Sequence, residues 1–159
     1  MITIGIDPGI ATIGYGVLEE KNRKICPICY SAVITSGKVK GMPERLEEIY
    51  VAICKVLDLY HPDCVAIEKL FFARNVTSAL NVAEVRGVIM LAARQRRIPV
   101  AEYTPNQVKQ AVTGSGKADK RQMQEMIRRL LSLEEIPRPD DVADALSVAL
   151  CHIRTAGIS

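Results

Sequence analysis

The order of the apolar segments constrains the fold of this chain more than any other feature of its sequence. Three short apolar runs come first, Ile2–Asp7, Ile13–Leu18 and Ile25–Thr35, with turn-forming residues between them. Such runs predict an antiparallel meander of three strands. After Pro43 the pattern changes to segments of helical period that alternate with short apolar runs. A meander followed by this alternation predicts a single α/β domain.

The predicted elements of the second part follow one another closely. A helix begins at Pro43 and repeats apolar residues with a helical period, and a short buried strand over Cys64–Ile67 ends at Glu68. The remaining predicted elements are helices over Val76–Arg96, Lys120–Leu131 and about Asp140–Arg154, a helix that starts at Thr104-Pro105, and a strand over Ile98–Tyr103. We assign residues 1–155 to the domain and residues 156–159 to a C-terminal tail.

The size and composition of the chain fit this assignment. Its 159 residues match one ordinary domain, and 48% hydrophobic with 25% charged residues is typical of a folded globular protein. No apolar run approaches the ~18–20 residues of a membrane span, and the N-terminus has no signal-peptide pattern. We therefore expect a cytoplasmic protein with no membrane partner.

The cysteines favour a reducing compartment. Their number, five, is odd and they are scattered along the chain, which is unlike a disulfide scaffold. Cys26 and Cys29 form a CxxC pair, but a structural zinc site needs a second pair of ligands. The only conceivable ones lie in apolar surroundings and are His61, Cys64, Cys151 and His152. We disfavour zinc for this reason.

The positive charge is concentrated in one stretch of the chain. The formal net charge is only +3, yet residues 109–130 hold six basic and two acidic side chains. Such a stretch can attract a polyanion, although a solvated helix face is the common alternative for a charge run.

Four acidic residues lie where a carboxylate is costly or crowded. Asp7 and Glu68 end apolar strands, and strand ends are where ligand sites form in open α/β sheets. Asp141 and Asp144 are three residues apart, so a helix places them on one face. Gathered carboxylates repel one another unless cations neutralise them, and oxygen ligands favour Mg²⁺ or Mn²⁺.

Each acid also has a structural explanation. Asp7 before Pro8-Gly9 fits a turn, Asp140 or Asp141 beside Pro139 fits a helix cap, and Glu68 can pair with a lysine. The joint occurrence of two strand-end acids and a paired-acid helix favours the metal site.

Two segments resemble phosphate-binding motifs, but neither meets the requirements of its motif. Gly114-Ser115-Gly116-Lys117 resembles a phosphate loop, but Ala111 and Ala118 replace the glycine and the hydroxyl residue it requires. Gly5-Ile6-Asp7-Pro8-Gly9 also resembles the first phosphate segment of actin-like and sugar-kinase ATPases. Those proteins need two lobes, for which this chain is too short.

Taken together, the motifs resemble those of one family over essentially the whole chain. They are Gly5-Ile6-Asp7-Pro8-Gly9 with Gly14 and Gly16, Ile67-Glu68 with Phe71 and Asn75, Arg86-Gly87, Tyr103 with Gln107 and Lys109, and Asp141 with Asp144-Ala145-Leu146. In this order they resemble the RuvC-type Holliday junction resolvases, of the RNase H-like superfamily.

The resemblance implies a fold and an activity. The expected fold is a five-stranded mixed sheet flanked by helices on both faces. The expected activity is a structure-selective endonuclease of DNA recombination and repair that makes paired symmetric nicks and leaves 5′-phosphate and 3′-hydroxyl ends. It needs Mg²⁺, two ions per active site, for which Mn²⁺ can substitute. The catalytic, metal-holding carboxylates would be Asp7, Glu68, Asp141 and Asp144, with Asp7 bridging both ions.

The resemblance also gives the basic stretch a role in binding DNA. Lys109 and Lys120 match positions where the family has lysines near the active-site phosphate. The further candidates are Lys117, Arg121 and Arg74 by proximity, and Phe71, which would stack on an unpaired base. The alternative for Phe71 is that both it and Phe72 belong to the core.

The expected partners follow from the substrate. A four-way junction presents two equivalent strands about a two-fold axis, which requires a homodimer. The helix Val76–Arg96 is the expected interface, through Ala79, Ala83, Gly87, Val82 and Leu91. The family also implies docking of the helicase proteins RuvA and RuvB in a bacterial cytoplasm.

Three other functions compete with this one. A YqgF-type nuclease shares the opening Asp motif but not the segments around Phe71, Lys109 and Asp141. A catalytically silent junction-binding module would lack an acid, and none of the four is missing. A nucleotide-binding kinase is disfavoured by length.

Overall fold

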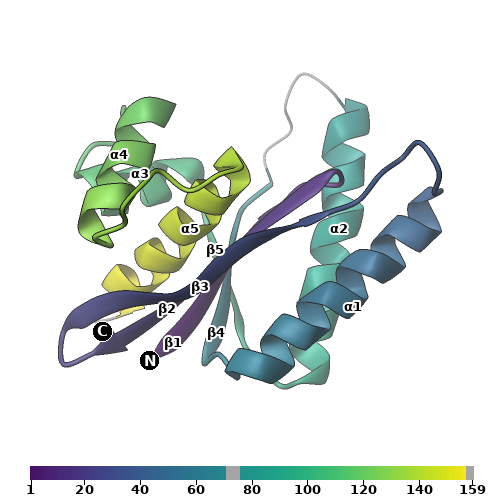
Figure 1. Ribbon diagram of the computed structural model, residues 1–159, viewed down its shortest axis with the longest axis horizontal. Helices are drawn as coiled ribbons and strands as arrows, with labels where there is room; N and C mark the ends of the chain where they lie inside the picture. Colours follow the sequence, from purple (N-terminus) through teal and green to yellow (C-terminus); the bar gives the residue numbers. More distant parts are fainter. Residues whose placement is uncertain (71–75, 157–159) are drawn as a thin grey trace.

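The fold is a five-stranded sheet with helices on both faces, seen in a computed structural model that describes residues 1–70 and 76–156 (Figure 1). In chain order the elements are β1 (Ile2–Pro8), β2 (Thr12–Lys21), β3 (Lys24–Ile34), α1 (Met42–Tyr60), β4 (Cys64–Glu68), α2 (Val76–Gln95), β5 (Val100–Tyr103), α3 (Pro105–Thr113), α4 (Lys120–Leu130) and α5 (Asp140–Ala156).

The strand order in the sheet is β3-β2-β1-β4-β5. β1, β2 and β3 form the antiparallel meander predicted from the sequence, while β4 pairs in parallel with β1 and with β5. The prediction of a mixed sheet is therefore confirmed. β5 is shorter than the predicted strand because the backbone N–H of Ile98 donates to Ala93, which makes Ile98 part of the turn that ends α2.

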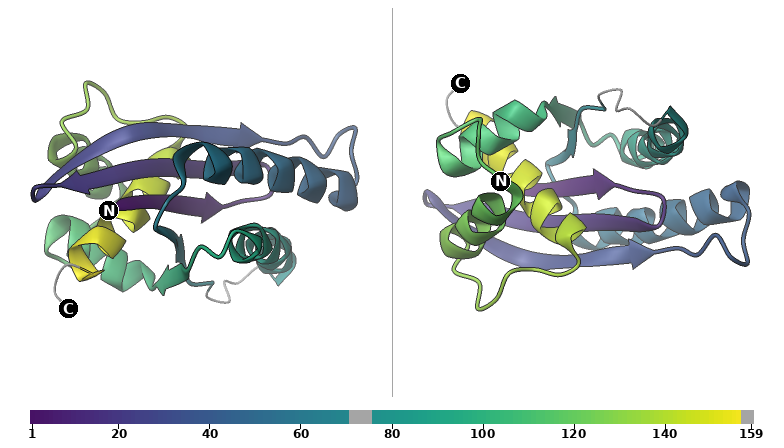
Figure 2. Two further views of the ribbon diagram at one scale, coloured as in Figure 1. Left: turned by 90° about the horizontal axis from the view of Figure 1, so that it is seen from below. Right: turned by 90° about the horizontal axis from the view of Figure 1, so that it is seen from above.

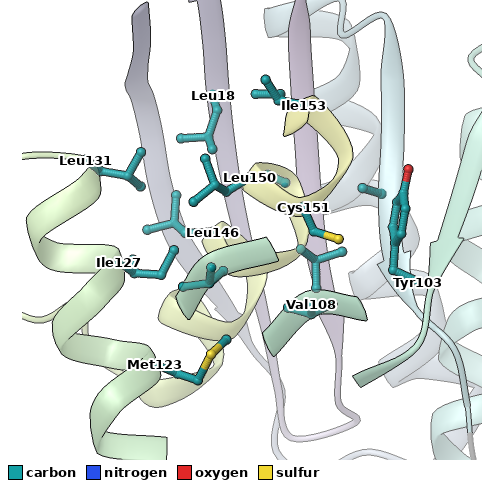
Figure 3. Packing of buried hydrophobic residues seen from close by; sticks show 14 of the residues in the cluster. Leu18, Tyr103, Val108, Met123, Ile127, Leu131, Leu146, Leu150, Cys151 and Ile153 are labelled. Atoms are coloured by element: carbon teal, nitrogen blue, oxygen red, sulfur yellow. The ribbon is translucent and has the colours of Figure 1, made fainter. Parts of the chain in front are cut away.

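The two faces of the sheet carry different helices and separate hydrophobic clusters. α1 and α2 cover one face, and Figure 2 shows α1 lengthwise and α2 almost end-on in both views. α5 covers the other face, with α3 and α4 packed on its outer side. Figure 3 shows Leu146 and Leu150 of α5 lying between Leu18 of β2 and Ile127 of α4. The helix with the paired acids is thus the central element of its layer.

α5 lies unusually close to the sheet because glycines face it. A Cβ atom on Gly5 would overlap the carbonyl oxygen of Ala145, and one on Gly14 would overlap that of Asp141. At Gly16 the space is filled by the side chain of Leu146. Any side chain at these positions would push the helix, and its acids, away from the strands.

By length and composition, α2 is the one helix among the described residues that qualifies as a membrane span, with a mean hydropathy of 1.4. This corrects our expectation that no apolar segment is long enough. One third of that window is buried within the domain, including Val85 and Ile89 against the sheet and the charged Arg86. These contacts make α2 a helix of the folded domain.

The cysteines lie apart from the acidic residues. Cys26 and Cys29 are half-buried on β3, and Cys64 is buried at the start of β4. His152 Nδ1 lies 2.8 Å from the Tyr103 hydroxyl, and burial lowers the pKa of its imidazole. Within residues 1–70 and 76–156 all five thiols are free, and no three His, Cys, Asp or Glu side chains form a group that could hold a metal ion.

Candidate active site

Asp7 and Glu68 lie side by side at the carboxyl ends of neighbouring parallel strands. The last residue pair between β1 and β4 is Ile6 with Ile67, and the two acids follow directly. Ile6 and Ile67 point into the cluster under α1 and α2. Because side chains alternate along a strand, Asp7 and Glu68 point to the opposite face, toward α5.

Asp141 approaches from the first turn of α5 and Asp144 from the second. Asp7 pairs with Gly14 across β1 and β2, and the backbone of Asp141 rests against Gly14. The glycine therefore places the start of α5 next to the end of β1. The charges of Asp144, Asp141 and Glu68 all act on the Asp7 carboxyl, so the four acids lie in one region of the fold.

The four carboxylates interact electrostatically, most strongly at Asp7. Burial raises the pKa of Asp7 from 3.8 to about 7, and the charges of Asp144, Asp141 and Glu68 add to that rise. Burial also raises the pKa of Asp144, with Asp141 contributing. Carboxyl groups with raised pKa values in one place are typical of active sites.

Glu68 responds in the same way but has more cationic neighbours. Burial first, and then the charge of Asp144, raise its pKa. The charges of Lys109 and Arg86 act in the opposite direction.

The arrangement fits a divalent cation by its chemistry. All four groups supply hard oxygen ligands, and no ion pair within the described ranges neutralises any of them. Among the same residues, no three side chains gather closely enough to form a ready metal-ligand group. The site thus has oxygen donors that no ion pair neutralises, while its side chains do not gather into a metal-ligand group.

Basic residues line one side of this acidic site. Lys109 of α3 and Lys120 of α4 border a cavity of ≈ 260 Å³ that also contacts Glu68 and Asp144. Both helices begin at capping boxes, Thr104 with Gln107 and Asp119 with Gln122, which fix where the helices start. The charge of Lys120 lowers the pKa of Asp7 and Asp144.

The other predicted DNA contacts are more distant or lie outside the described residues. Lys117 is exposed in the connection between α3 and α4, and Arg121 is exposed in the first turn of α4. Phe71 and Arg74 fall in the segment outside the described residues, so their predicted roles stay predictions.

Two residues in this region, Asp140 and Arg86, make contacts that the sequence alone does not predict. Asp140, next to the predicted ligand Asp141, accepts from Lys120 at 2.9 Å and from Arg138 at 2.5 Å. On the other face of the sheet, Arg86 donates to the backbone carbonyl of Glu68 and to the side chain of Glu102. Apart from the pair of Arg138 and Asp140, these contacts join residues that are far apart in the chain, and periodicity does not reveal such pairs.

A larger cavity of ≈ 440 Å³ lies at the amino end of β4, bordered by Asp58, His61 and Arg96. Its Asp58 is neutralised by Arg96, whose Nε and second nitrogen lie 2.5 and 2.8 Å from the two carboxylate oxygens. A paired carboxylate of this kind offers no free ligand, so we place the active site at the carboxyl ends of the strands.

The mixed sheet with acids at the ends of β1 and β4 and on α5 defines an RNase H-like nuclease domain. A solved structure of the yeast mitochondrial Holliday junction resolvase Ydc2 shares this fold, with a TM-score of 0.69, 16% identity, and coverage of 96% of this chain and 77% of that chain.

Closer relatives identify the family within that class. The sequence model described as Crossover junction endodeoxyribonuclease RuvC matches residues 3–152. The protein of that name from Caldicellulosiruptor saccharolyticus is 51% identical over 154 residues, 96% of this chain and 92% of the relative. A structure of Thermus thermophilus RuvC in complex with Holliday junction substrate matches with a TM-score of 0.91 and 35% identity, covering 100% of this chain and 97% of that one. The chain belongs to the RuvC family.

Proposed function

We propose that this chain is a crossover junction endodeoxyribonuclease that resolves Holliday junctions by paired symmetric nicks. The observation that carries the proposal is the electrostatic coupling of four carboxylates from three separate elements at Asp7. Its relatives are named for this activity, and a relative of the same fold binds a Holliday junction. Cleavage leaves 5′-phosphate and 3′-hydroxyl ends, which DNA ligase can rejoin during DNA recombination and repair.

Nucleases of the RuvC family depend on divalent metal ions. We assign Asp7, Glu68, Asp141 and Asp144 as the groups that hold two Mg²⁺ ions here, with Mn²⁺ as a substitute. Bound there, the cations would activate water and stabilise the leaving 3′ oxygen. The support from this chain is that its donors are oxygen atoms alone and that their mutual repulsion is relieved by cations.

The residues of this chain then divide into two groups. Asp7 and Glu68, fixed at strand ends, define the position of the scissile phosphate against α5. Lys109 and Lys120 contact that phosphate or its neighbours, because both border the cavity beside Glu68. Lys117 and Arg121 extend the basic surface along the DNA, and phosphate contacts of this kind supply most of the affinity. Phe71 stacks on a base at the crossover and Arg74 contacts the backbone.

The partner that completes the enzyme is a second copy of this chain. α2 exposes an apolar surface formed by Leu80, Ala83, Gly87 and Leu91, and Leu80 and Leu91 are 58% and 53% exposed. Ala79, which we also expected there, is buried within the domain. Pairing of two copies along α2 gives two active sites related by a two-fold axis, as symmetric incision requires.

The wider assignment follows the family. We place the action of this protein in the bacterial cytoplasm, on junction DNA delivered by the helicase proteins RuvA and RuvB.

The proposal is tested with a synthetic four-way junction labelled on each strand and a linear duplex of the same sequence, both incubated with Mg²⁺. Two symmetric nicks that DNA ligase can reseal, with the duplex left uncut, are the expected result. Equal cutting of junction and duplex would contradict junction selectivity and leave a general nuclease.

A further inference from the structure

Arg86 is an unusual residue in the layer on the far side of the sheet from the acidic site. Among residues 1–70 and 76–156 it is the only charged residue that is buried. A buried guanidinium is tolerated only where partners satisfy its charge and its donors. The partners that α2 places within its reach are Glu68 and Glu102.

The two contacts connect α2 to the last residue of β4 and to the penultimate residue of β5. One guanidinium nitrogen donates to the backbone carbonyl of Glu68, and the other pairs with the carboxylate of Glu102. Glu102 on β5 is the register partner of Ile67, so both acceptors lie at the same end of the sheet. The rigid fork of the guanidinium fits two acceptors in fixed positions.

The carbonyl that Arg86 contacts lies at a critical point of the chain. The carbonyl belongs to Glu68, the residue whose carboxylate faces α5. Glu68 comes directly after Ile67, which forms the last residue pair between β4 and β1 with Ile6. The same peptide has a second hydrogen bond, which the Lys69 N–H donates to the Tyr103 carbonyl, so removal of Arg86 leaves the peptide held on one side alone. Its carbonyl then lacks a donor, which is costly, and the peptide can tilt about the remaining bond. Rotation of that peptide changes the direction of the Glu68 side chain on the opposite face.

We propose that Arg86 is a positioning residue that fixes the Glu68 carboxylate, through its backbone carbonyl, for metal binding. The inference rests on the proposed metal site, in which Glu68 is a ligand. Arg86 acts from the opposite face of the sheet and touches neither metal nor DNA. Loss of such outer contacts weakens metal binding by about 10- to 100-fold in other proteins.

The test measures Mn²⁺ binding to the metal-free protein by calorimetry, without DNA. Arg86→Met is expected to raise the Kd for Mn²⁺ by about tenfold or more. Arg86→Lys keeps the charge but not the two-pronged guanidinium, so its Kd for Mn²⁺ is expected to lie between those of the unsubstituted protein and Arg86→Met. Arg96→Met is the matched control, because Arg96 follows the same helix and forms an equally paired contact with Asp58, away from Glu68.

The outcomes distinguish failure of the positioning role of Arg86 from failure of the proposed metal site. An unchanged Mn²⁺ Kd in Arg86→Met, or equal weakening in Arg96→Met, overturns the positioning role while the metal site stands. Absence of Mn²⁺ binding by the unsubstituted protein overturns the metal site and the inference with it. Thermal melts establish that each variant is folded; if Arg86→Met is not, Arg86→Lys decides, and a wild-type Kd in that folded variant overturns the inference.

Discussion

Asp7 on β1 and Gly14 on β2 face each other across the antiparallel pair, and the carbonyl of Asp141 occupies the space that a side chain at Gly14 would need. The position of the α5 acids relative to Asp7 therefore depends on a residue with no side chain. Asp7 gains its raised pKa partly from the α5 acids that this approach brings near.

Gly14→Ala is expected to disturb the active site and the packing together. The added methyl overlaps the helix backbone, so α5 must shift, at a cost of about 1–3 kcal/mol. We expect a lower free energy of unfolding in urea and at least about tenfold slower junction cleavage, since small misplacements of catalytic groups are expensive. Gly37→Ala is the control, because its methyl meets only the end of the Arg45 side chain. Equal behaviour of the two variants would contradict the close approach of α5.

The contribution of Asp7 to the stability of the metal-free protein is expected to fall as the pH rises from about 4 to about 7, while the lowered pKa of His152 acts in the opposite direction. Asp7 has a pKa of about 7 when folded and 3.8 ordinarily, so the folded state holds its proton more tightly across this window. Folding is therefore favoured at the acidic end, and the difference amounts to about 4 kcal/mol. Glu68 and Asp144, whose pKa values are also raised, act in the same direction.

Urea unfolding at pH 5 and pH 7.5 in a chelator measures this effect. Asp7→Asn should flatten the pH dependence, and saturating Mg²⁺ should do the same by neutralising the carboxylates. An equal pH dependence in the chelated wild-type protein and in Asp7→Asn would show that the folded state does not hold the Asp7 proton more tightly.

Lys120 is expected to contribute to junction binding through a phosphate. It lies between Asp140, at 2.9 Å, and the acidic site, and its side chain is 60% exposed and open to DNA. Lys120→Ala should reduce the slope of log affinity against log salt concentration by about 1. Lys55→Ala, on the exposed side of α1, should leave the slope unchanged. Fluorescence anisotropy in Ca²⁺ or without metal measures these slopes. A slope for Lys120→Ala identical to that of the wild-type protein would show that Lys120 does not contact a phosphate.

Leu91→Glu is expected to separate the proposed dimer. Leu91 is 53% exposed on α2, and a buried unpaired carboxylate at an apolar interface is strongly unfavourable. Light scattering should give a monomer, and the two nicks in one junction should become uncoupled. Leu59→Glu on α1, where the leucine is 69% exposed, is the control and should remain dimeric. A dimer that survives Leu91→Glu but not Leu59→Glu would place the interface on α1.

The sequence predicted the fold well because its elements carry strong periodic patterns. Asp7 and Glu68 were singled out from the sequence because a carboxylate at the end of an apolar strand is conspicuous. The expectation of a five-stranded mixed sheet came from a family resemblance, and the order of its strands came only from the structure, since local patterns do not determine which strands pair.

What the sequence did not predict depends on contacts between distant segments. Arg86 belongs to a motif that resembles the family, but the sequence gives it no partner, and only the fold brings it to Glu68. Asp140 similarly looks like a duplicate of Asp141 until α4 brings Lys120 to it. Ala79 was wrongly predicted to lie on the exposed side of α2. Apolar residues occur all around this helix, so the sequence shows no clear periodic face.

The central claim is that the acidic site at Asp7 cleaves junction DNA. The most direct measurement is Mg²⁺-dependent cleavage of a labelled four-way junction by Asp7→Asn, alongside the exposed-acid control Glu135→Gln. We expect Asp7→Asn to bind the junction with wild-type affinity and to make no paired nicks, while Glu135→Gln cuts normally. Paired nicking by a folded Asp7→Asn at the wild-type rate would contradict the assignment of this site.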